Sequence, residues 1–295
     1  MSTFQQEIRS GERFRFGRNW SRFLKTVDDD RVAIARQSLE DKLQTSSLAG
    51  SRLLDAGCGS GLFSLAARQL GARVHSIDFD PESVACARWL RDSHFPEDAD
   101  WTIEAASVLD RDYLAALGTF DVVYSWGVLH HTGHMGQALD NMIPLVNVGG
   151  RLFISVYNDQ GRISRRWARV KKFYCSLPAW LQPAFTVAWY GPRELRRMLL
   201  ATVLLRPHKY FRSWEAYRKR RGMSRWHDYV DWLGGYPFEV ARPEDIVQRY
   251  WPGGFVLERM KTVGGGLGCN EFVFRRIAET AVTEPAESGP VRLSA

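Results

Sequence analysis

The stretch that decides the fold is Leu53-Leu54-Asp55-Ala56-Gly57-Cys58-Gly59-Ser60-Gly61. It places a glycine loop between an apolar run, residues 52–55, and a helical pattern, residues 62–70. Glycines allow a tight turn and the close approach of a ligand to the backbone, and the first turn of the following helix has unpaired N–H groups. The stretch therefore predicts a strand, a ligand-binding turn and a helix, in that order.

Apolar runs and helical patterns alternate along this half of the chain. The predicted strands span residues 52–55, 73–77, 101–104, 120–125 and 151–156, and the predicted helices span residues 62–70, 81–92, 110–117 and 134–146. An amphipathic helix with an acidic first turn is expected ahead of them, at residues 28–45. Strands that alternate with helices are typical of an α/β fold with a parallel, doubly wound sheet.

The alternation stops after the fifth strand. Residues 157–236 read as helices that are rich in basic and aromatic residues and interrupted by prolines, which indicates an inserted subdomain. A helix at residues 243–250 and strands at residues 255–262 and 270–275 follow. The glycine turn 264–266 between these strands is too short for a parallel crossover, so the sheet is predicted to end in an antiparallel hairpin.

These patterns divide the chain into five segments. We expect an N-terminal gate and helix, a ligand-binding core, a mainly helical insertion, a last helix with the terminal hairpin, and a polar tail that is disordered because it lacks apolar periodicity. They span residues 1–50, 51–156, 157–241, 242–277 and 278–295.

Composition excludes several classes of protein. A chain of 295 residues with 45% apolar and 25% charged residues is not wholly disordered. The four cysteines lie far apart without a C-x-x-C pair, so neither a disulfide framework nor a zinc cluster is expected. The N-terminus lacks the apolar segment of a secretory signal, and no run approaches the roughly 20 apolar residues of a membrane span. A cytoplasmic location is therefore expected.

The net charge of +7 is unevenly distributed. Residues 157–236 contain 17 basic and five acidic residues, whereas the rest of the chain contains 23 basic and 28 acidic ones. Six of the eleven tryptophans also lie in this insertion. Arginine interleaved with large aromatic residues suits an anionic membrane surface, a nucleic acid or an acidic small molecule, and it occurs on ordinary solvated helices as well.

An acidic residue, Asp78, closes the second predicted strand, 21 residues after Gly57. A carboxylate there can accept hydrogen bonds from both hydroxyls of a ribose, which indicates a nucleoside site. A dinucleotide fingerprint requires a small residue where Leu62 stands, so NAD is disfavoured. Asp55, two residues before Gly57, would repel a pyrophosphate but suits an ammonium group. S-adenosylmethionine carries an ammonium, a carboxylate and a ribose diol, and all three find a partner here.

At these residues the sequence resembles the class I S-adenosylmethionine-dependent methyltransferases, over residues 53–156 and the terminal hairpin. The resemblance implies a seven-stranded Rossmann-like sheet with an antiparallel last strand. It also implies that the glycine loop holds the methionine end of the cofactor, that Asp78 binds the ribose and that the loop after the third strand faces the adenine. The cofactor-binding residues are then Asp55, Gly57, Gly59, Asp78, Phe79, Ser107, Val108 and Trp126. Many relatives have an acid where Ser107 stands.

The exit of the fourth strand carries the candidates for proton transfer, His130 and His131. A histidine that titrates near neutral pH can take a proton from a hydroxyl or thiol, although these residues can instead cap the helix that follows. They have no carboxylate or cysteine nearby to complete a metal site, so no metal is expected. Tyr157, after the fifth strand, is the third catalytic candidate. It begins a polar run that orients an acceptor or simply ends the strand.

The insertion leaves the sheet at the edge where the ligand binds, so we expect it to roof the pocket as an acceptor lid. Within it, residues 226–239 concentrate acids, histidine and aromatics, and we expect them to line the acceptor pocket with the turn near Gly266. The aromatic N-terminal run 14–20 either gates the cofactor or packs against the insertion. The candidate acceptor-binding residues are Asn19, Trp20, Asn158, Asp231 and Tyr236.

The leading interpretation is an enzyme that transfers the methyl group of S-adenosylmethionine to an oxygen, sulfur or nitrogen atom of a small molecule. An RNA or tRNA methyltransferase that uses the basic insertion is the second, although nucleic acid is not expected because no RNA-binding module is recognisable. A non-catalytic cofactor-binding or membrane-surface protein is the third. The expected partners are the small-molecule acceptor and, transiently, an anionic membrane surface.

Overall fold

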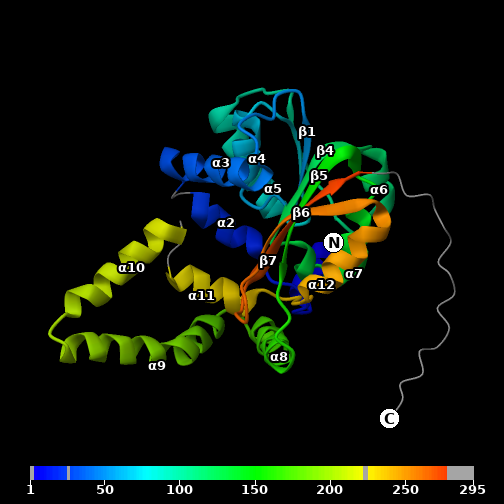
Figure 1. The fold of residues 1–295 in the computed structure, drawn as a ribbon. Coiled ribbons are helices and arrows are strands. Elements are labelled where there is room, and N and C mark those ends of the chain that lie inside the picture. The colour runs from blue at the N-terminus through cyan, green and yellow to red at the C-terminus, as the bar shows by residue number, and fades with distance from the viewer. Residues whose placement is uncertain (1–2, 25–26, 222–224, 278–295) are drawn as a thin grey trace, which may run out of the picture.

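The computed structural model describes residues 3–24, 27–221 and 225–277. Its centre is a seven-stranded sheet in the order β3-β2-β1-β4-β5-β7-β6 (Figure 1). The first five strands are parallel, and β7 runs antiparallel between β5 and β6. The predicted doubly wound α/β fold with an antiparallel last strand is thus confirmed. The strands are β1 (Arg52–Ala56), β2 (Arg73–Asp78), β3 (Trp101–Ala105), β4 (Phe120–Trp126), β5 (Val146–Tyr157), β6 (Phe255–Lys261) and β7 (Cys269–Arg276).

Helices cover both faces of the sheet, and each face has its own apolar core (Figure 1). Three of the helices begin at an aspartate whose side chain accepts a backbone N–H of the first turn, which satisfies a donor that the helix leaves unpaired. One face carries α3 (Asp29–Leu43), α4 (Leu62–Gln69) and α5 (Pro81–His94), and the other carries α6 (Arg111–Ala116), α7 (Met135–Met142) and α12 (Pro243–Tyr250).

The end of α7 differs from the sequence prediction. A helix was expected over residues 134–146 and a strand over residues 151–156, but α7 ends at Met142 and β5 already begins at Val146. Pro144 interrupts the helical pattern because it has no N–H to donate. Val146 pairs instead with Phe120, so β5 extends the sheet beyond the predicted strand.

The N-terminal segment forms two helices that the sequence did not reveal, α1 (Thr3–Arg9) and α2 (Phe16–Leu24). Helix α2 packs against α5. The backbone N–H of Gly17 donates a hydrogen bond to Asp80, the N-cap residue of α5, over 2.7 Å. This contact holds α2 beside the carboxyl edge of the sheet.

The insertion after β5 is helical, as predicted: α8 (Arg162–Ser176), α9 (Gln182–Val203), α10 (Pro207–Arg221) and α11 (Arg225–Gly234). Four residues, Tyr174, Tyr190, Tyr229 and Leu233, form its own small core. Helices α9 and α10 make a hairpin that extends away from the sheet (Figure 1). The tail expected to be disordered, residues 278–295, lies outside the described residues.

None of the helices in the described ranges has the length and apolarity that crossing a membrane requires.

Candidate functional site

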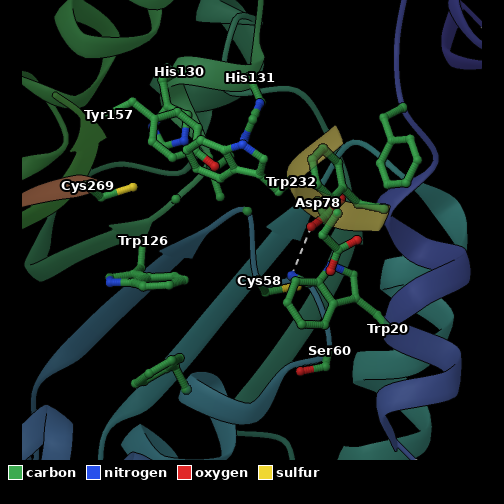
Figure 2. A pocket seen from close by; sticks show the side chains of 18 of the residues that line it. Trp20, Cys58, Ser60, Asp78, Trp126, His130, His131, Tyr157, Trp232 and Cys269 are labelled. Atoms are coloured by element: carbon green, nitrogen blue, oxygen red, sulfur yellow. Dashed lines mark hydrogen bonds between the residues drawn. The ribbon is translucent and has the colours of Figure 1, made fainter. Parts of the chain in front are cut away.

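A cavity of about 1230 Å³ lies at the carboxyl edge of the parallel strands. Its walls come from the strand ends, the N-terminal helices, the turn between β6 and β7, and the lid helices α8, α9 and α11. Figure 2 shows His130, His131 and Tyr157 together at one end, and Asp78, Cys58 and Trp20 at the other. Parts of the chain far apart in sequence therefore enclose one space.

The glycine loop needs residues without side chains at two positions. Gly57 has φ +87°, and a Cβ there would collide with the side chain of Val128. Gly59 has φ +54°, and a Cβ there would lie 3.0 Å from the ring of Trp20. Positive φ is costly for any residue with a Cβ. The loop is therefore fixed between the exit of β4 on one side and α2 on the other.

Asp78, the last residue of β2, faces this loop. Its two carboxylate oxygens accept backbone N–H groups from Gly59 and from Asp80, both over 2.9 Å. Burial raises the pKa of Asp78 to about 6, against the lowering effect of these hydrogen bonds. Each carboxylate oxygen has a further lone pair, so the group can also accept two hydroxyl donors from a ligand.

Asp55, the acid before the loop, is buried at the end of a hydrogen-bonded chain. Ser64 donates to Asp55 over 2.5 Å, Ser76 donates to Ser64 over 2.8 Å, and the indole of Trp101 donates to Ser76 over 2.9 Å. Burial raises the pKa of Asp55 to about 7, and the negative charge of Asp78 adds to the increase. This series of hydrogen bonds runs from Trp101 on β3 to Asp55 on β1 and fixes the carboxyl group of Asp55 next to the glycine loop.

The loop after β3 lines the cavity with Ala106, Ser107, Val108 and Leu109. Val108 is buried, and its carbonyl accepts a hydrogen bond from the side-chain amide of Asn141. The hydroxyl of Ser107 accepts the backbone N–H of Leu109 over 3.1 Å. Phe79 stands edge-on to Phe4 with the ring centroids 5.5 Å apart. All eight residues predicted to bind the cofactor line the cavity.

The other end of the cavity is an aromatic cluster. The ring centroid of Tyr157 lies 4.0 Å from that of His130, 5.4 Å from that of His131 and 5.7 Å from that of Trp232. Trp232 comes from α11 of the insertion. The two histidines come from the short 3-10 helix η1 (Leu129–His131) that follows β4, and Tyr157 ends β5. The lid and the sheet thus share one wall.

Burial disfavours the protonated form of both histidines and so lowers their pKa values. The imidazole Nδ1 of His131 lies 2.6 Å from the carbonyl oxygen of Pro237, which can only accept, so Nδ1 carries the proton and Nε2 is left as an acceptor. Burial lowers the pKa of His131 to about 3, and it lowers that of the fully buried His130 well below its usual value. His131 is therefore suited to accept a hydrogen bond rather than to hold a proton.

The five candidate acceptor-binding residues fall into two groups. Trp20 and Asp231 line the cavity, and Asn19 donates a hydrogen bond to Asp231 from α2. Burial raises the pKa of Asp231 to about 7. Asn158 and Tyr236 lie outside the cavity lining. The amide of Asn158 donates to the carbonyls of the β6–β7 turn at residues 264 and 266, so it holds that turn in place.

Several cavity residues were not singled out from the sequence. Trp189, Tyr190 and Arg193 of α9 line the lid side, in a stretch where aromatic residues precede a Gly-Pro pair. Lys171 of α8 lies behind the wall: it is fully buried and donates to the backbone carbonyl of Trp232, with its ammonium 4.4 Å from that ring. Burial lowers the pKa of Lys171 to about 7. In the sequence, the only sign of this part of the cavity is the large number of aromatic residues in the insertion.

The described residues contain no group of three or more histidine, cysteine, aspartate or glutamate side chains that could hold a metal ion.

Comparison with protein families gives one match that covers more than half of the chain. The family described as "Methyltransferase domain" matches residues 30–203. Ubiquinone biosynthesis O-methyltransferases from Xanthomonas oryzae pv. oryzae (strain PXO99A) and Xylella fastidiosa (strain M23) are 35% and 37% identical, each over 38% of this chain. The chain spans only 45% and 44% of the length of these relatives.

The fold is similar to that of a solved structure. PKMT2 from Rickettsia typhi, in complex with AdoHcy, superposes with a TM-score of 0.52 at 12% identity, over 82% of this chain and 52% of that one. Magnesium protoporphyrin IX methyltransferase from Synechocystis PCC 6803, with bound SAM, gives a TM-score of 0.47 at 15% identity, over 83% of this chain and 79% of that one.

Proposed function

The chain belongs to the family of class I methyltransferase domains, and from this premise we propose that it transfers a methyl group from S-adenosylmethionine to a small-molecule acceptor. The observation that carries the proposal is the single cavity that joins the carboxylate of Asp78 to the aromatic wall around Tyr157. An enzyme of this kind needs two adjacent sites, one for the methyl donor and one for the acceptor. The cytoplasmic location expected from the sequence is part of the proposal.

The residues at the glycine-loop end fit the donor. Asp78 has lone pairs for two ribose hydroxyls beyond the two backbone N–H groups that it already accepts. Asp55 supplies an acid near the loop, where the ammonium of the methionine end would be favoured. Phe79 and Val108 present apolar surface for a purine, and Ser107 presents a hydroxyl beside them. The donor, when bound, supplies a methyl group that the sulfonium already activates.

The residues at the lid end hold and orient the acceptor. Trp232 and Tyr157 form an apolar aromatic wall, which suits a planar acceptor. The free Nε2 of His131 accepts a hydrogen bond from a hydroxyl of that acceptor and so fixes its direction. Asp231 lies on the same side and offers a second acceptor atom. In-line methyl transfer depends chiefly on such positioning, because the leaving group is already activated.

Release of S-adenosylhomocysteine tests the proposal. The purified protein is incubated with S-adenosylmethionine and a panel of phenols, sugars, thiols and short RNAs. We expect turnover with one or more planar small molecules and a strong loss of turnover in Trp232→Ala, with donor affinity retained. Release that requires RNA would favour the RNA methyltransferase, and a protein that does not bind S-adenosylmethionine at all would end the proposal.

A further inference from the structure

The distal half of α9 and the start of α10 expose a cluster of large apolar side chains. We define the hairpin tip as the six residues with exposed fractions between 51% and 88%: Leu199, Leu200, Val203, Leu204, Leu205 and Phe211. They lie in and on both sides of the turn that joins the two helices, at the end of the hairpin that extends away from the sheet (Figure 1). Exposed apolar clusters of this kind mark sites of interaction rather than ordinary surface.

The backbone at the apex adds an independent observation. Leu205 has φ +54°, a left-handed conformation that favours glycine or asparagine in a turn, and its side chain is 88% exposed. A leucine at this position is unfavourable for two reasons: its Cβ disfavours the left-handed backbone conformation, and its apolar side chain is exposed to water. Strain of this type occurs where a residue has a binding role.

Basic residues surround the apolar tip. Residues 195–212 contain five basic residues and no acid. All five, Arg196, Arg197, Arg206, Lys209 and Arg212, are exposed. The nearest preceding acid, Glu194, accepts hydrogen bonds from Tyr229 and Arg225 inside the lid and also pairs with Arg197 over 2.8 Å. It therefore offsets the charge of Arg197, whereas Arg206, Lys209 and Arg212 lie further along the hairpin. The hairpin therefore presents apolar side chains at its end with positive charge beside them.

We propose that the hairpin tip inserts into the headgroup region of an anionic lipid bilayer. The leucine, valine and phenylalanine side chains enter the boundary between headgroups and acyl chains, and Arg206, Lys209 and Arg212 contact lipid phosphates. A nucleic acid would instead need the charges at the apex, where Leu204 and Leu205 stand. Two copies of this chain joined through their tips would bring like charges together.

The same helix connects the tip to the cavity. Trp189, Tyr190 and Arg193 of α9 line the cavity, and Val203 lies ten residues beyond Arg193, about 15 Å along the helix. A bound bilayer would thus hold the lid near the membrane surface. This inference does not depend on methyl transfer, because it concerns a surface outside the cavity.

Flotation with vesicles tests the proposal. The full chain is mixed with vesicles that contain about a third phosphatidylglycerol, or with phosphatidylcholine vesicles, and centrifuged through a gradient. We expect it to float with the anionic vesicles only. Removal of three charges in Arg206→Gln/Lys209→Gln/Arg212→Gln should lower the partition coefficient roughly 100-fold. Removal of apolar surface in Leu200→Ser/Val203→Ser/Leu205→Ser should lower it at least about tenfold.

Matched variants elsewhere on the surface control for net charge and apolarity. Arg36→Gln/Arg91→Gln/Arg242→Gln removes three positive charges, and Val148→Ser/Trp251→Ser/Ile277→Ser removes three exposed apolar side chains. Both should float like the unmodified protein. Calorimetry with S-adenosylmethionine checks that every variant is folded, and it reports on the cavity separately from the tip.

Four results would overturn the proposal. The first two are that the unmodified protein does not float with anionic vesicles, or that a control variant loses as much vesicle binding as the tip variants. The third is a dimer in sedimentation without vesicles that the tip substitutions abolish, while they leave flotation unchanged. The fourth is binding of a short RNA that depends on the tip, without binding to vesicles.

Discussion

Replacement of Asp78 by asparagine removes one charge and leaves the size of the side chain unchanged. The carboxylate accepts the N–H groups of Gly59 and Asp80 with separate oxygens. An amide has only one acceptor oxygen, so its NH2 group must face one of these two donors, and one ribose hydroxyl loses its partner. A hydrogen bond to a charged group contributes about 1.5–3 kcal/mol, so the loss of one such bond should weaken binding by about 1.5–3 kcal/mol. This corresponds to a Kd for S-adenosylmethionine that is roughly 10- to 150-fold higher.

Calorimetric titration measures this change directly. Asp121→Asn is the matched control, because Asp121 also accepts a backbone N–H, from Arg52 over 2.8 Å, but at the start of β4, away from the cavity. Its Kd should stay within about twofold of the unmodified protein. If a folded Asp78→Asn protein bound S-adenosylmethionine within about threefold of the original, Asp78 would not be the ribose ligand.

Three further predictions follow from the geometry of the loop. Gly57→Ala should lower the free energy of unfolding, measured by urea denaturation, by about 2–4 kcal/mol, because residue 57 has a positive φ and the added Cβ collides with Val128. Adding Val128→Ala to this variant should restore part of the lost stability. An unchanged stability of Gly57→Ala would refute the collision. Ser64→Ala leaves Asp55 without its hydroxyl donor and should lower the free energy of unfolding by about 1–3 kcal/mol. The control Ser93→Ala, at an exposed hydroxyl, should lower it by under about 0.5 kcal/mol. Equal losses of stability in the two variants would contradict the role of the hydrogen-bonded side chains. Burial raises the pKa of Asp55 to about 7 and that of Asp78 to about 6, so both carboxyl groups become neutral as the pH falls. The Kd for the cationic donor should therefore rise below about pH 7, and binding should release protons. A Kd that is constant between pH 8 and about pH 5.5 would contradict the raised pKa values.

The cofactor end could be predicted from the sequence because its parts are local. Asp55 and Gly57 belong to one strand–turn–helix unit, and Asp78 ends the next strand, which pairs with the first in the sheet. Parallel strands bring their carboxyl ends to one edge, so spacing along the chain gives proximity in space. All the cofactor candidates consequently line one cavity.

The acceptor end could not be predicted in the same way because its contacts join distant segments. His131 is fixed by the carbonyl of Pro237, and Asn19 meets Asp231, over sequence separations of 106 and 212 residues. The polar run after β5 suggested that Asn158 orients an acceptor, but the same side chain holds the β6–β7 turn. Neither pairing has a signal in spacing or periodicity.

The N-terminal helices and the hairpin tip show the same limit. Helix α2 contains Gly17 and begins without an acidic first turn, so its stability comes from packing on α5 rather than from its own sequence. The charge of the insertion could be counted, but the outward direction of Leu199 and Val203 depends on how α9 packs in the lid.

The most direct test of the central claim is a crystal structure of the protein with S-adenosylhomocysteine. We predict density for the ligand in this cavity, with the ribose hydroxyls within hydrogen-bond distance of Asp78 and the purine beside Val108. A ligand bound elsewhere, or one whose ribose does not contact Asp78, would contradict it.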